Sequence, residues 1–344
     1  MDTIKPIKIG SEKLYPHEKL TSAEVGKLWA TYMGNNMSTR ILSYFLQHVE
    51  DQQIKTLLEH ALTLSEEFQR TIKEIFVKEK IPVPHGFTAE DVNLGAPRLF
   101  QDEFYVHYLK YAGKAGMSIY NVAVPLMYRE DVRNFYLHCM NSTMELMEQI
   151  KTILMNKGLI IKPPIIPIPE NVKVASPGYQ KGFMGDVRSL HALEIAHLYD
   201  NIESNVTSST LIMAFGQFAK MDKVREVFKK GEETTLRSVD RYMEKLQDDN
   251  LPAPSSLGHL VTTSTFSPFS DKLMLFHKVD MFSMRIRAFG NSLAVNGRHD
   301  LVALYGKSLA DIFMFVEEAS KLMMENGWME VPPEAADRED LASN

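Results

Sequence analysis

Hydrophobic residues recur at helical spacing along most of this 344-residue chain. A capping box of Thr21 with Glu24 opens the first run, in which apolar residues follow each other at intervals of three and four positions. A second run starts at Asp51, and a third and a fourth cover roughly 100–127 and 130–157. The alternation of apolar and polar residues that marks β-strands is missing from the sequence. The pattern therefore predicts an all-α protein.

The second half of the sequence repeats the first. Four similar runs occupy about 190–220, 222–249, 271–295 and 299–326. Short segments also match: KIPVP at 80–84 with NLPAP at 250–254, and REDVRNFY at 129–136 with RHDLVALY at 298–305. These matches keep their order and a separation of about 170 positions, which is longer than the repeats of solenoid proteins. We interpret the chain as two domains with one fold, produced by an internal duplication.

The lengths of the connections predict how the helices are joined in each half. Helices one and two meet within a few residues around Asp51, and helices three and four meet at Tyr128–Glu130 and Asn296–His299. Between helices two and three lie about twenty residues that contain prolines, enough to run the full height of a bundle. One long crossover between two tight hairpins is typical of the ferritin-like four-helix bundle. The aspartates that open each third helix, Asp102 and Asp271, are expected to act as caps or dipole partners there.

The repeat also divides the chain into segments. We expect an N-terminal arm, a first bundle, a proline-rich linker, a second bundle and a tail, at residues 1–21, 22–160, 161–187, 188–330 and 331–344. Five prolines make the linker a semi-rigid strap, and its isoleucines indicate that it lies on the protein surface. The two units are expected to pack as a pseudo-dimer within one chain, which would then be a monomer or a weak homodimer.

Several segments resemble a known family. They are GFTAEDVNLGAPRLFQDEF at 86–104, FSPFSDKLMLFH at 266–277 and NGWMEVPP at 326–333. Together they are similar to the bacillar family catalogued as domain of unknown function 3231, over essentially the whole chain. The resemblance implies a tandem pair of ferritin-like four-helix bundles from a spore-forming Gram-positive lineage. It implies no activity.

Composition excludes several classes of protein. The net charge is −6 and no basic stripe is concentrated, so no nucleic-acid partner is expected. No uncharged apolar run reaches about 18 residues, which argues against a membrane span, and the N-terminus lacks the apolar region of a signal peptide. The one cysteine, Cys139, fits a reducing compartment. We therefore expect a cytoplasmic globular protein.

A ferritin-like topology raises the question of a di-metal centre. Such a centre needs inward glutamates and a Glu-x-x-His pair from each of two helices. Glu194 and His197 form the only Glu-x-x-His of the chain, and they are expected to flank the buried stripe beside Ile195 and Leu198. We therefore predict no metal and no cofactor, with Glu194 and His197 as the remaining metal candidates.

Two histidines and four small polar residues are the candidate ligand-binding residues. His107 and His277 lie 170 positions apart in apolar stretches of the third helices, either hydrogen-bonded to a neighbouring helix or facing a ligand. The first helix of each unit is interrupted in its middle by polar residues that continue its apolar stripe: Asn35, Thr39, Asn205 and Ser209. They form either a satisfied polar network or a small pocket for a ligand or water.

No phosphate loop, zinc spacing or nucleophile motif stands out in the sequence. Arg129 with Asp131, and Arg298 with Asp300, are interpreted as caps with local ion pairs at the start of each fourth helix. The sequence favours a non-enzymatic binding or structural module. Two alternatives remain open: a ferritin-like metal-binding or redox protein with a non-standard ligand set, and a small-ligand carrier that uses polar pockets in the middle of the bundles.

Overall fold

The computed structural model describes residues 18–160, 162–185, 187–295 and 297–338. The first half contains α1 (Ser22–His48), α2 (Gln52–Glu79), α3 (Asp102–Ala123) and α4 (Glu130–Asn156). The second half contains α5 (Ala192–Phe218), α6 (Asp222–Gln247), α7 (Asp271–Val295) and α8 (His299–Glu325). The described residues form no strand beyond two isolated bridges, so the predictions of an all-α fold and of a duplicated chain are confirmed. Residues 1–17 of the predicted arm and 339–344 of the predicted tail lie outside the described residues.

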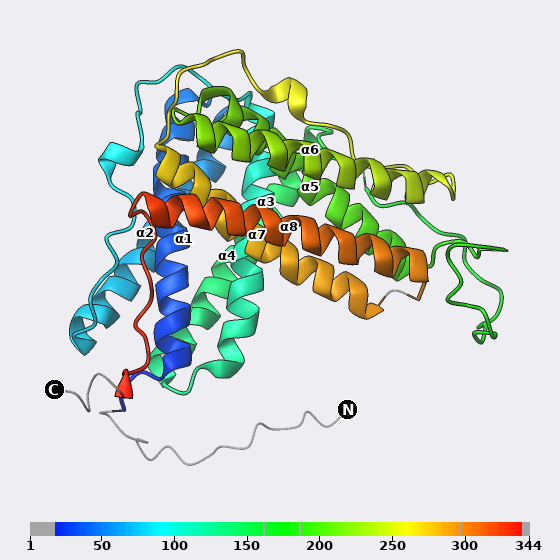
Figure 1. The fold of residues 1–344 in the computed structure, drawn as a ribbon, viewed down its shortest axis with the longest axis horizontal. Coiled ribbons are helices and arrows are strands. Elements are labelled where there is room, and N and C mark those ends of the chain that lie inside the picture. The colour runs from blue at the N-terminus through cyan, green and yellow to red at the C-terminus, as the bar shows by residue number, and fades with distance from the viewer. Residues whose placement is uncertain (1–17, 161, 186, 296, 339–344) are drawn as a thin grey trace.

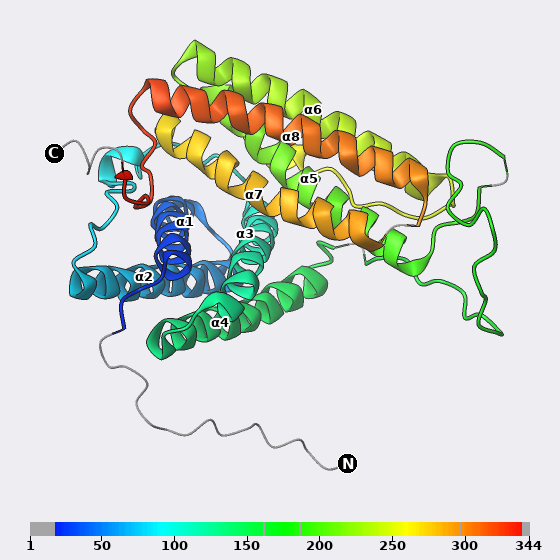
Figure 2. The same ribbon diagram turned by 60° about the horizontal axis from the view of Figure 1, so that its bottom comes forward.

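Each half is a four-helix bundle with one long connection. Short turns join its first helix to its second and its third to its fourth, whereas residues 80–101 and 248–270 connect the second helix to the third. In the first bundle α1 packs on α2 and α3, and α4 packs on the same two helices; the second bundle repeats this arrangement. This helix order is compatible with a ferritin-like bundle. Figures 1 and 2 show the second bundle lying across one side of the first.

The third helices lie at the centre of the molecule. α3 packs on α7 and also on α5, and α7 reaches α1 of the other half. Figure 2 shows α3 and α7 side by side between the two bundles. Each third helix is therefore buried both within its own bundle and against the other one.

A buried glutamate fixes the turn that precedes α4. Glu24 is fully buried, and its carboxylate accepts hydrogen bonds from the backbone N–H groups of Tyr128 and Arg129 at 3.0 and 2.8 Å. It also accepts one from the N–H of Thr21 at 2.7 Å, which completes the predicted capping box of α1. Burial acts to raise the pKa of Glu24, but the hydrogen bonds from Thr21 and Arg129 outweigh it, so the pKa is lowered. One carboxylate thus joins the N-termini of α1 and α4.

Glu194 occupies the same place in the second bundle, which corrects its predicted position. It was expected to flank the buried stripe, yet its side chain is fully buried. It accepts hydrogen bonds from the backbone of Gly297 and Arg298 at 3.1 and 3.3 Å, and the Arg188 guanidinium donates to both of its oxygens at 2.8 Å. A carboxylate is favourable in a buried place when several N–H groups satisfy it, and the sequence pattern alone does not reveal those donors.

Two aspartates perform the same task at the other end of each bundle. The Asp102 carboxylate accepts hydrogen bonds from the backbone of Glu50 and Asp51 at 3.0 and 2.6 Å, in the turn between α1 and α2. Asp271 does the same for the turn between α5 and α6, at 3.0 and 2.8 Å. They were expected to act as caps or as dipole partners of the helices that they open. Both lie in the first turn of those helices, as dipole partners do, and their hydrogen bonds hold the neighbouring turns.

The predicted ion pairs at the starts of α4 and α8 are present. Arg129 donates to Asp131 at 2.6 Å, and Arg298 donates to Asp300 at 2.8 Å. Asp131 also accepts a hydrogen bond from the backbone N–H of Val132 at 2.9 Å. The two arginines make no side-chain cap hydrogen bond, because a guanidinium has no acceptor; Glu24 and Glu194 hold the backbone at these helix starts.

The two long connections pair with each other. Val92 forms an antiparallel bridge with Phe269, and Phe100 forms one with Val261. Backbone hydrogen bonds of 2.7–3.0 Å accompany these bridges. Val261 lies 169 positions after Val92, and Phe269 lies 169 positions after Phe100. The two bridges are therefore the same contact with the halves exchanged, so an approximate twofold axis relates the halves here.

The linker differs from expectation. Ile165, Ile168 and Val172 are more than nine-tenths exposed, so these apolar residues do not cover the protein surface as predicted. Only the last part of the segment is attached to the second bundle, where the Arg188 guanidinium lies 4.0 Å from the centre of the Tyr179 ring.

Replacing the buried glutamate tests the link between α1 and α4. We expect Glu24→Ala to lower the free energy of unfolding by about 2–4 kcal/mol, because buried backbone donors lose their acceptor. Since the folded pKa of Glu24 is lowered, its contribution is present above the ordinary glutamate pKa of 4.5 and is lost as the pH falls through the lower folded value. Denaturant unfolding at pH 7 and at pH 3 measures both effects. The exposed Glu66→Ala is the matched control, and an equal, small effect of both variants would contradict the role of Glu24.

Separating the halves tests how far they depend on each other. Residues 1–160 and 188–344, expressed separately, are expected to unfold at lower temperatures than the intact chain, because α3 and α7 would each expose a buried face. Thermal unfolding followed by circular dichroism is the measurement. Two helical fragments as stable as the whole chain would show that the contact contributes little.

Candidate ligand-binding cavity

The middle of the first bundle contains a cavity of about 90 Å³. Residues of α1, α2, α3 and α4 line it, and two residues of α7 from the other half complete the wall. A water molecule takes about 30 Å³ in the liquid, so the cavity has room for about three waters or for one organic molecule of similar size. Ala30 is exposed at the surface of α1 and also borders the cavity, which indicates where it opens to solvent.

Small residues on two helices create this space. α1 contributes Gly34 and Ser38, which lie in the polar interruption seen in the sequence. α3 faces them with small residues at successive turns: Ala112, Gly113, Ala115 and Gly116. Without large side chains at these positions, the helices leave a void at mid-height instead of a close-packed layer.

Three hydroxyl groups on the cavity wall have no hydrogen-bond partner among the described residues. Ser38, Ser65 and Thr143 each line the cavity, and within the described part of the chain none of their hydroxyl groups makes a hydrogen bond. Ser65 and Thr143 are nevertheless buried, with exposed fractions of 8% and 6%. Buried polar groups are normally hydrogen-bonded, so these hydroxyls are available to bind a molecule in the cavity.

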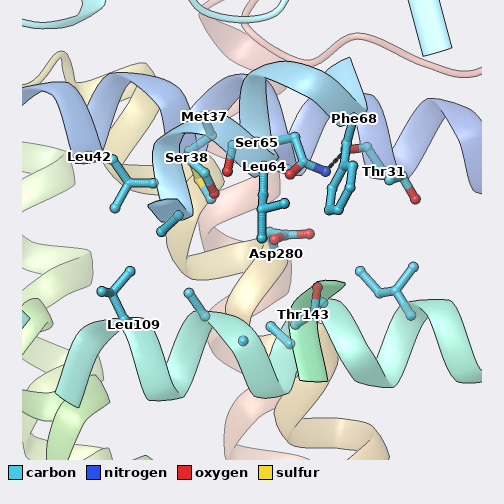
Figure 3. Close-up of a pocket in the computed structure, with 18 of the residues that line it drawn as sticks. Thr31, Met37, Ser38, Leu42, Leu64, Ser65, Phe68, Leu109, Thr143 and Asp280 are labelled. Carbon is cyan, nitrogen blue, oxygen red and sulfur yellow. Dashed lines mark hydrogen bonds between the residues drawn. The ribbon is translucent and has the colours of Figure 1, made fainter. Parts of the chain in front are cut away.

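Asp280 is the one carboxylate on the cavity wall. It comes from α7 and approaches Gly34, where an added Cβ would lie 3.7 Å from the Asp280 carboxylate. Figure 3 shows its side chain in the space between α1 and α3. Among the described residues, no side chain forms an ion pair or hydrogen bond with this carboxylate. Burial raises the pKa of Asp280 to about 6, although Arg287 on the same helix acts to lower it.

The remaining polar groups of the wall are partly engaged. The Asn35 amide donates to the Thr31 carbonyl at 2.8 Å, and the Asn35 side chain also interacts with the Tyr120 hydroxyl. The Thr31 hydroxyl shares a hydrogen bond with the Tyr136 hydroxyl at 3.2 Å. The wall therefore offers mainly acceptors and adaptable hydroxyls around one carboxylate.

Ring contacts establish which residues of the two third helices are equivalent. Phe45 lies 5.1 Å from Tyr108 in the first bundle, and Phe215 lies 5.6 Å from His277 in the second. Tyr108 and His277 are thus equivalent, at a separation of 169 positions. The prediction that His107 and His277 are repeat equivalents is wrong. The two sequences differ by one residue between the opening aspartate and the histidine, and matching the histidines hid that shift.

With this register, α7 carries large side chains where α3 has glycines. Phe282 and Arg285 of α7 stand at the positions that Gly113 and Gly116 occupy in α3. Both large side chains are buried, at 2% exposure each. In the first bundle, Met147 and Tyr120 pack against the two glycines instead, beside the cavity.

A lysine amine enters the filled core. Lys278 is fully buried, and its Nζ donates to the Ser208 hydroxyl at 2.7 Å. It also lies 4.8 Å from the centre of the Phe282 ring. Burial lowers the pKa of Lys278 well below its usual range, and Arg285 acts in the same direction. The first bundle has Leu109 at the equivalent position.

Of the four predicted mid-helix residues, one borders the cavity. Asn35 lines it. Thr39, Asn205 and Ser209 are buried, but each donates to a carbonyl of its own helix, at 2.7, 2.8 and 2.9 Å. Of the two predicted alternatives, these three residues therefore match the satisfied polar network and not the pocket.

The two predicted histidines lie on the contact between the halves. His277 accepts or donates a hydrogen bond with the Tyr108 hydroxyl at 3.1 Å, while its Nδ1 has no partner among the described residues. His107 is 7% exposed and borders a small pocket beside Glu203 and Leu257. Burial lowers the pKa of His107 to about 4, although Glu203 acts to raise it, so the ring is neutral at pH 7.

The metal candidates do not converge. Both oxygens of Glu194 are engaged in the hydrogen bonds described above. His197 lies about one turn further along α5 and is half-buried. Within the described ranges, no group of three or more His, Cys, Asp or Glu side chains is arranged to hold a metal ion. Cys139 is buried, and burial raises the pKa of its thiol.

Sequence reasoning missed Asp280, Ser65 and Thr143. A signal for Asp280 was present, since α7 carries charges in the apolar stretch FHKVDMFSMRIRAF.

No helix in the described residues is long and apolar enough to cross a bilayer.

The cost of the unpaired carboxylate can be measured. We expect Asp280→Asn to raise the free energy of unfolding at pH 7.5 by about 1–3 kcal/mol, because one pKa unit corresponds to about 1.4 kcal/mol. The folded pKa near 6 exceeds the ordinary 3.8, so wild-type stability falls as the pH rises from 4 to 6 and then levels off. Urea unfolding in phosphate buffer at pH 4, 5, 6 and 7.5 measures this, with the exposed Asp240→Asn as control. A stability difference that does not change with pH would show that Asp280 is not the titrating group.

Comparisons with known proteins agree with the duplication. The model of a family described as a protein of unknown function (DUF3231) matches the chain twice, over residues 9–172 and 180–341. The crystal structure of a proposed spore coat protein from Bacillus halodurans C-125 resembles part of the chain, with 20% identity and a TM-score of 0.40. That likeness covers 44% of this chain and 98% of the other. None of the curated proteins matches the sequence. The two matches span nearly the whole chain, which therefore belongs to the DUF3231 family and carries two tandem copies of its domain.

Proposed function

We propose that this protein is a non-enzymatic binding protein that holds a small molecule in the core of its first bundle. The observation that carries the proposal is the cavity of about 90 Å³, whose wall presents a carboxylate and three hydroxyl groups without protein partners. Unsatisfied polar groups around a void of this size define a place for an occupant that can hydrogen-bond to them.

The duplicated bundle supports the proposal. In the second half the equivalent space is closed by Phe282 and Arg285. A cavity costs packing energy, so the void weakens the first bundle relative to a filled one. The second copy demonstrates that the same fold is compatible with a filled core, which makes the hollow one a candidate for function.

The lining favours binding over catalysis. Among the residues that line the cavity there is no histidine, cysteine or lysine to act beside Asp280 as a second proton-transfer group or as a nucleophile. We assign the second bundle a supporting role, in which α7 closes the wall and supplies Asp280.

We place this activity in the cytoplasm. The single cysteine is buried and protonated, which fits a protein that needs no disulfide in a reducing compartment.

Filling the cavity tests the proposal. We expect Ala112→Met, which introduces the residue found at the equivalent position 281, to occupy the void and abolish ligand binding. Native mass spectrometry of the untagged protein detects a co-purified ligand. Saturation-transfer NMR with neutral and charged molecules of two to five non-hydrogen atoms detects weak binders.

The matched control is Ala303→Met, at an exposed position of α8. Binding that is lost in Ala112→Met and kept in Ala303→Met, with equal thermal stability, supports the pocket. Equal binding to both variants, or none to the wild type, contradicts it and leaves a cavity that contains water alone.

A further inference from the structure

We propose that the occupant of the cavity is a small ammonium ion, either ammonium itself or a short primary amine, bound at the Asp280 carboxylate. This inference rests on the proposed function and names the chemical class of its ligand. Three observations carry it: a half-buried carboxylate on the cavity wall that no described side chain pairs with, a lysine amine at the matching place in the other bundle, and a wall of hydrogen-bond acceptors.

Among the described residues, no cation lies within ion-pair distance of the Asp280 carboxylate. Arg287, two turns further along α7, acts on it electrostatically, but its guanidinium donates to the Ser118 hydroxyl at 2.8 and 3.1 Å and to the Ser283 hydroxyl at 3.4 Å. A carboxylate withdrawn from water is costly unless it is paired and hydrogen-bonded, so Asp280 is a natural place for a cation from outside.

The contact between α3 and α5 contains the ion pairs that Asp280 lacks. There α3 faces α5, and Lys110 and Lys114 form ion pairs with Glu203 at 2.5 and 2.9 Å. Where α7 faces α1, the residue at the position of Glu203 is Met33. Charges on the third helices are therefore paired on one side of the molecule, and Asp280 is left without a partner on the other.

The second bundle contains the missing group. The amine of Lys278 reaches the Ser208 hydroxyl, and Ser208 is the equivalent of Ser38 on the wall of the cavity. The first bundle keeps the serine but has Leu109 in place of the lysine. An ammonium ion beside Ser38 would thus occupy the place that a covalently attached amine takes in the duplicate.

The two cores complement each other in charge. Tyr111 is the equivalent of Asp280, so the second bundle has an amine without a carboxylate and the first has a carboxylate without an amine. The pKa shifts agree: the pKa of Lys278 is lowered and the pKa of Asp280 is raised, each mainly by burial. Neither bundle contains an ion pair of this amine and this carboxylate. A free ammonium ion in the first bundle would form that ion pair with Asp280.

The wall fits the donors of such an ion. An ammonium group has at least three N–H donors and no acceptor. One donor pairs with Asp280, and the hydroxyl oxygens of Ser38, Ser65 and Thr143 are available for the others. The apolar part of a short amine would contact Leu64 and the rest of the aliphatic wall. Figure 3 shows the Leu64 and Asp280 side chains in the space between α1 and α3.

Methylammonium chloride is the probe for the direct test. Saturation-transfer NMR at pH 8 on the full-length protein should show binding of the methyl group, with a dissociation constant on the order of 1–10 mM for so small a ligand. We expect Asp280→Asn to weaken binding at least tenfold, while Asp240→Asn leaves it unchanged. Methanol, as a neutral molecule of the same size, should bind at least tenfold more weakly than methylammonium.

The binding should depend on pH. The groups near Asp280 are Arg287 on its own helix and the phenols Tyr108, Tyr111 and Tyr120 of α3, while Lys27 of α1 lies near Arg287. We do not expect these groups to titrate between pH 5 and 8, because arginine, lysine and tyrosine ordinarily have pKa values of about 10 or above. With a carboxyl pKa near 6, affinity for methylammonium should fall about tenfold from pH 8 to pH 5.

A lysine in the first bundle tests the same place from inside the protein. Leu109→Lys copies the second bundle and is expected to supply the ammonium group, so that methylammonium no longer binds. Leu109→Lys should lower the melting temperature of the wild type less than it lowers the melting temperature of the Asp280→Asn variant, because only the wild type has the carboxylate that can pair with the new lysine. Equal losses in both backgrounds would show that the two side chains do not pair.

The outcomes separate this inference from the proposed function. If neutral molecules bind to the wild type and not to Ala112→Met, but methylammonium does not bind, the pocket stands and the ammonium assignment is wrong. If potassium chloride competes with methylammonium at equal concentration, or Asp280→Asn binds it within twofold of the wild type, the assignment is also wrong. If no probe binds, both fail.

Discussion

The packing of α3 against α7 is the contact on which the rest of the molecule depends. Tyr108 meets its own equivalent His277 across the approximate twofold axis at 3.1 Å, and Ser118 meets its equivalent Arg287 at 2.8 Å. Because each third helix packs against its own bundle and against the other one, little of its middle faces solvent. Its polar residues therefore enter the other bundle: Asp280 reaches the cavity of the first, and Tyr111 lies near Lys278 in the core of the second.

Carboxylates provide the second constraint, because they connect elements that are distant in the sequence. Glu24 and Asp102 each hold the backbone of a turn that belongs to another hairpin, and their equivalents do the same in the second half. Four-helix bundles pack through apolar side chains, which alone specify neither the height of each helix nor the position of its turns. Charged acceptors with two or more N–H donors fix both ends of each bundle, so the cavity at mid-height lies between two rigid layers.

Much of the fold could be predicted from the sequence, because helix periodicity, turn residues and the long connections are local features. The starts of α2, α4, α7 and α8 agree with the predicted ones to within one residue. The register of the third helices could not be predicted. A shift of one residue turns a side chain by about 100° around a helix, and the match of His107 with His277 concealed such a shift. Glu194 was misplaced because its donors belong to residues about a hundred positions away, and Asp280 was missed because it faces a cavity of the other half.

Duplication explains how one fold can combine a stable core with a hollow one. Core packing tolerates changes in side-chain volume only at a cost, and a void or an unpaired buried charge lowers stability. In this chain both cores contain a charge without an opposite charge beside it among the described residues: Asp280 at the cavity of the first bundle and Lys278 in the second. The contact between α3 and α7 joins the two bundles, so each is supported by packing against its neighbour. The void is an added cost of the first bundle, and a single bundle would have to carry it without a neighbour.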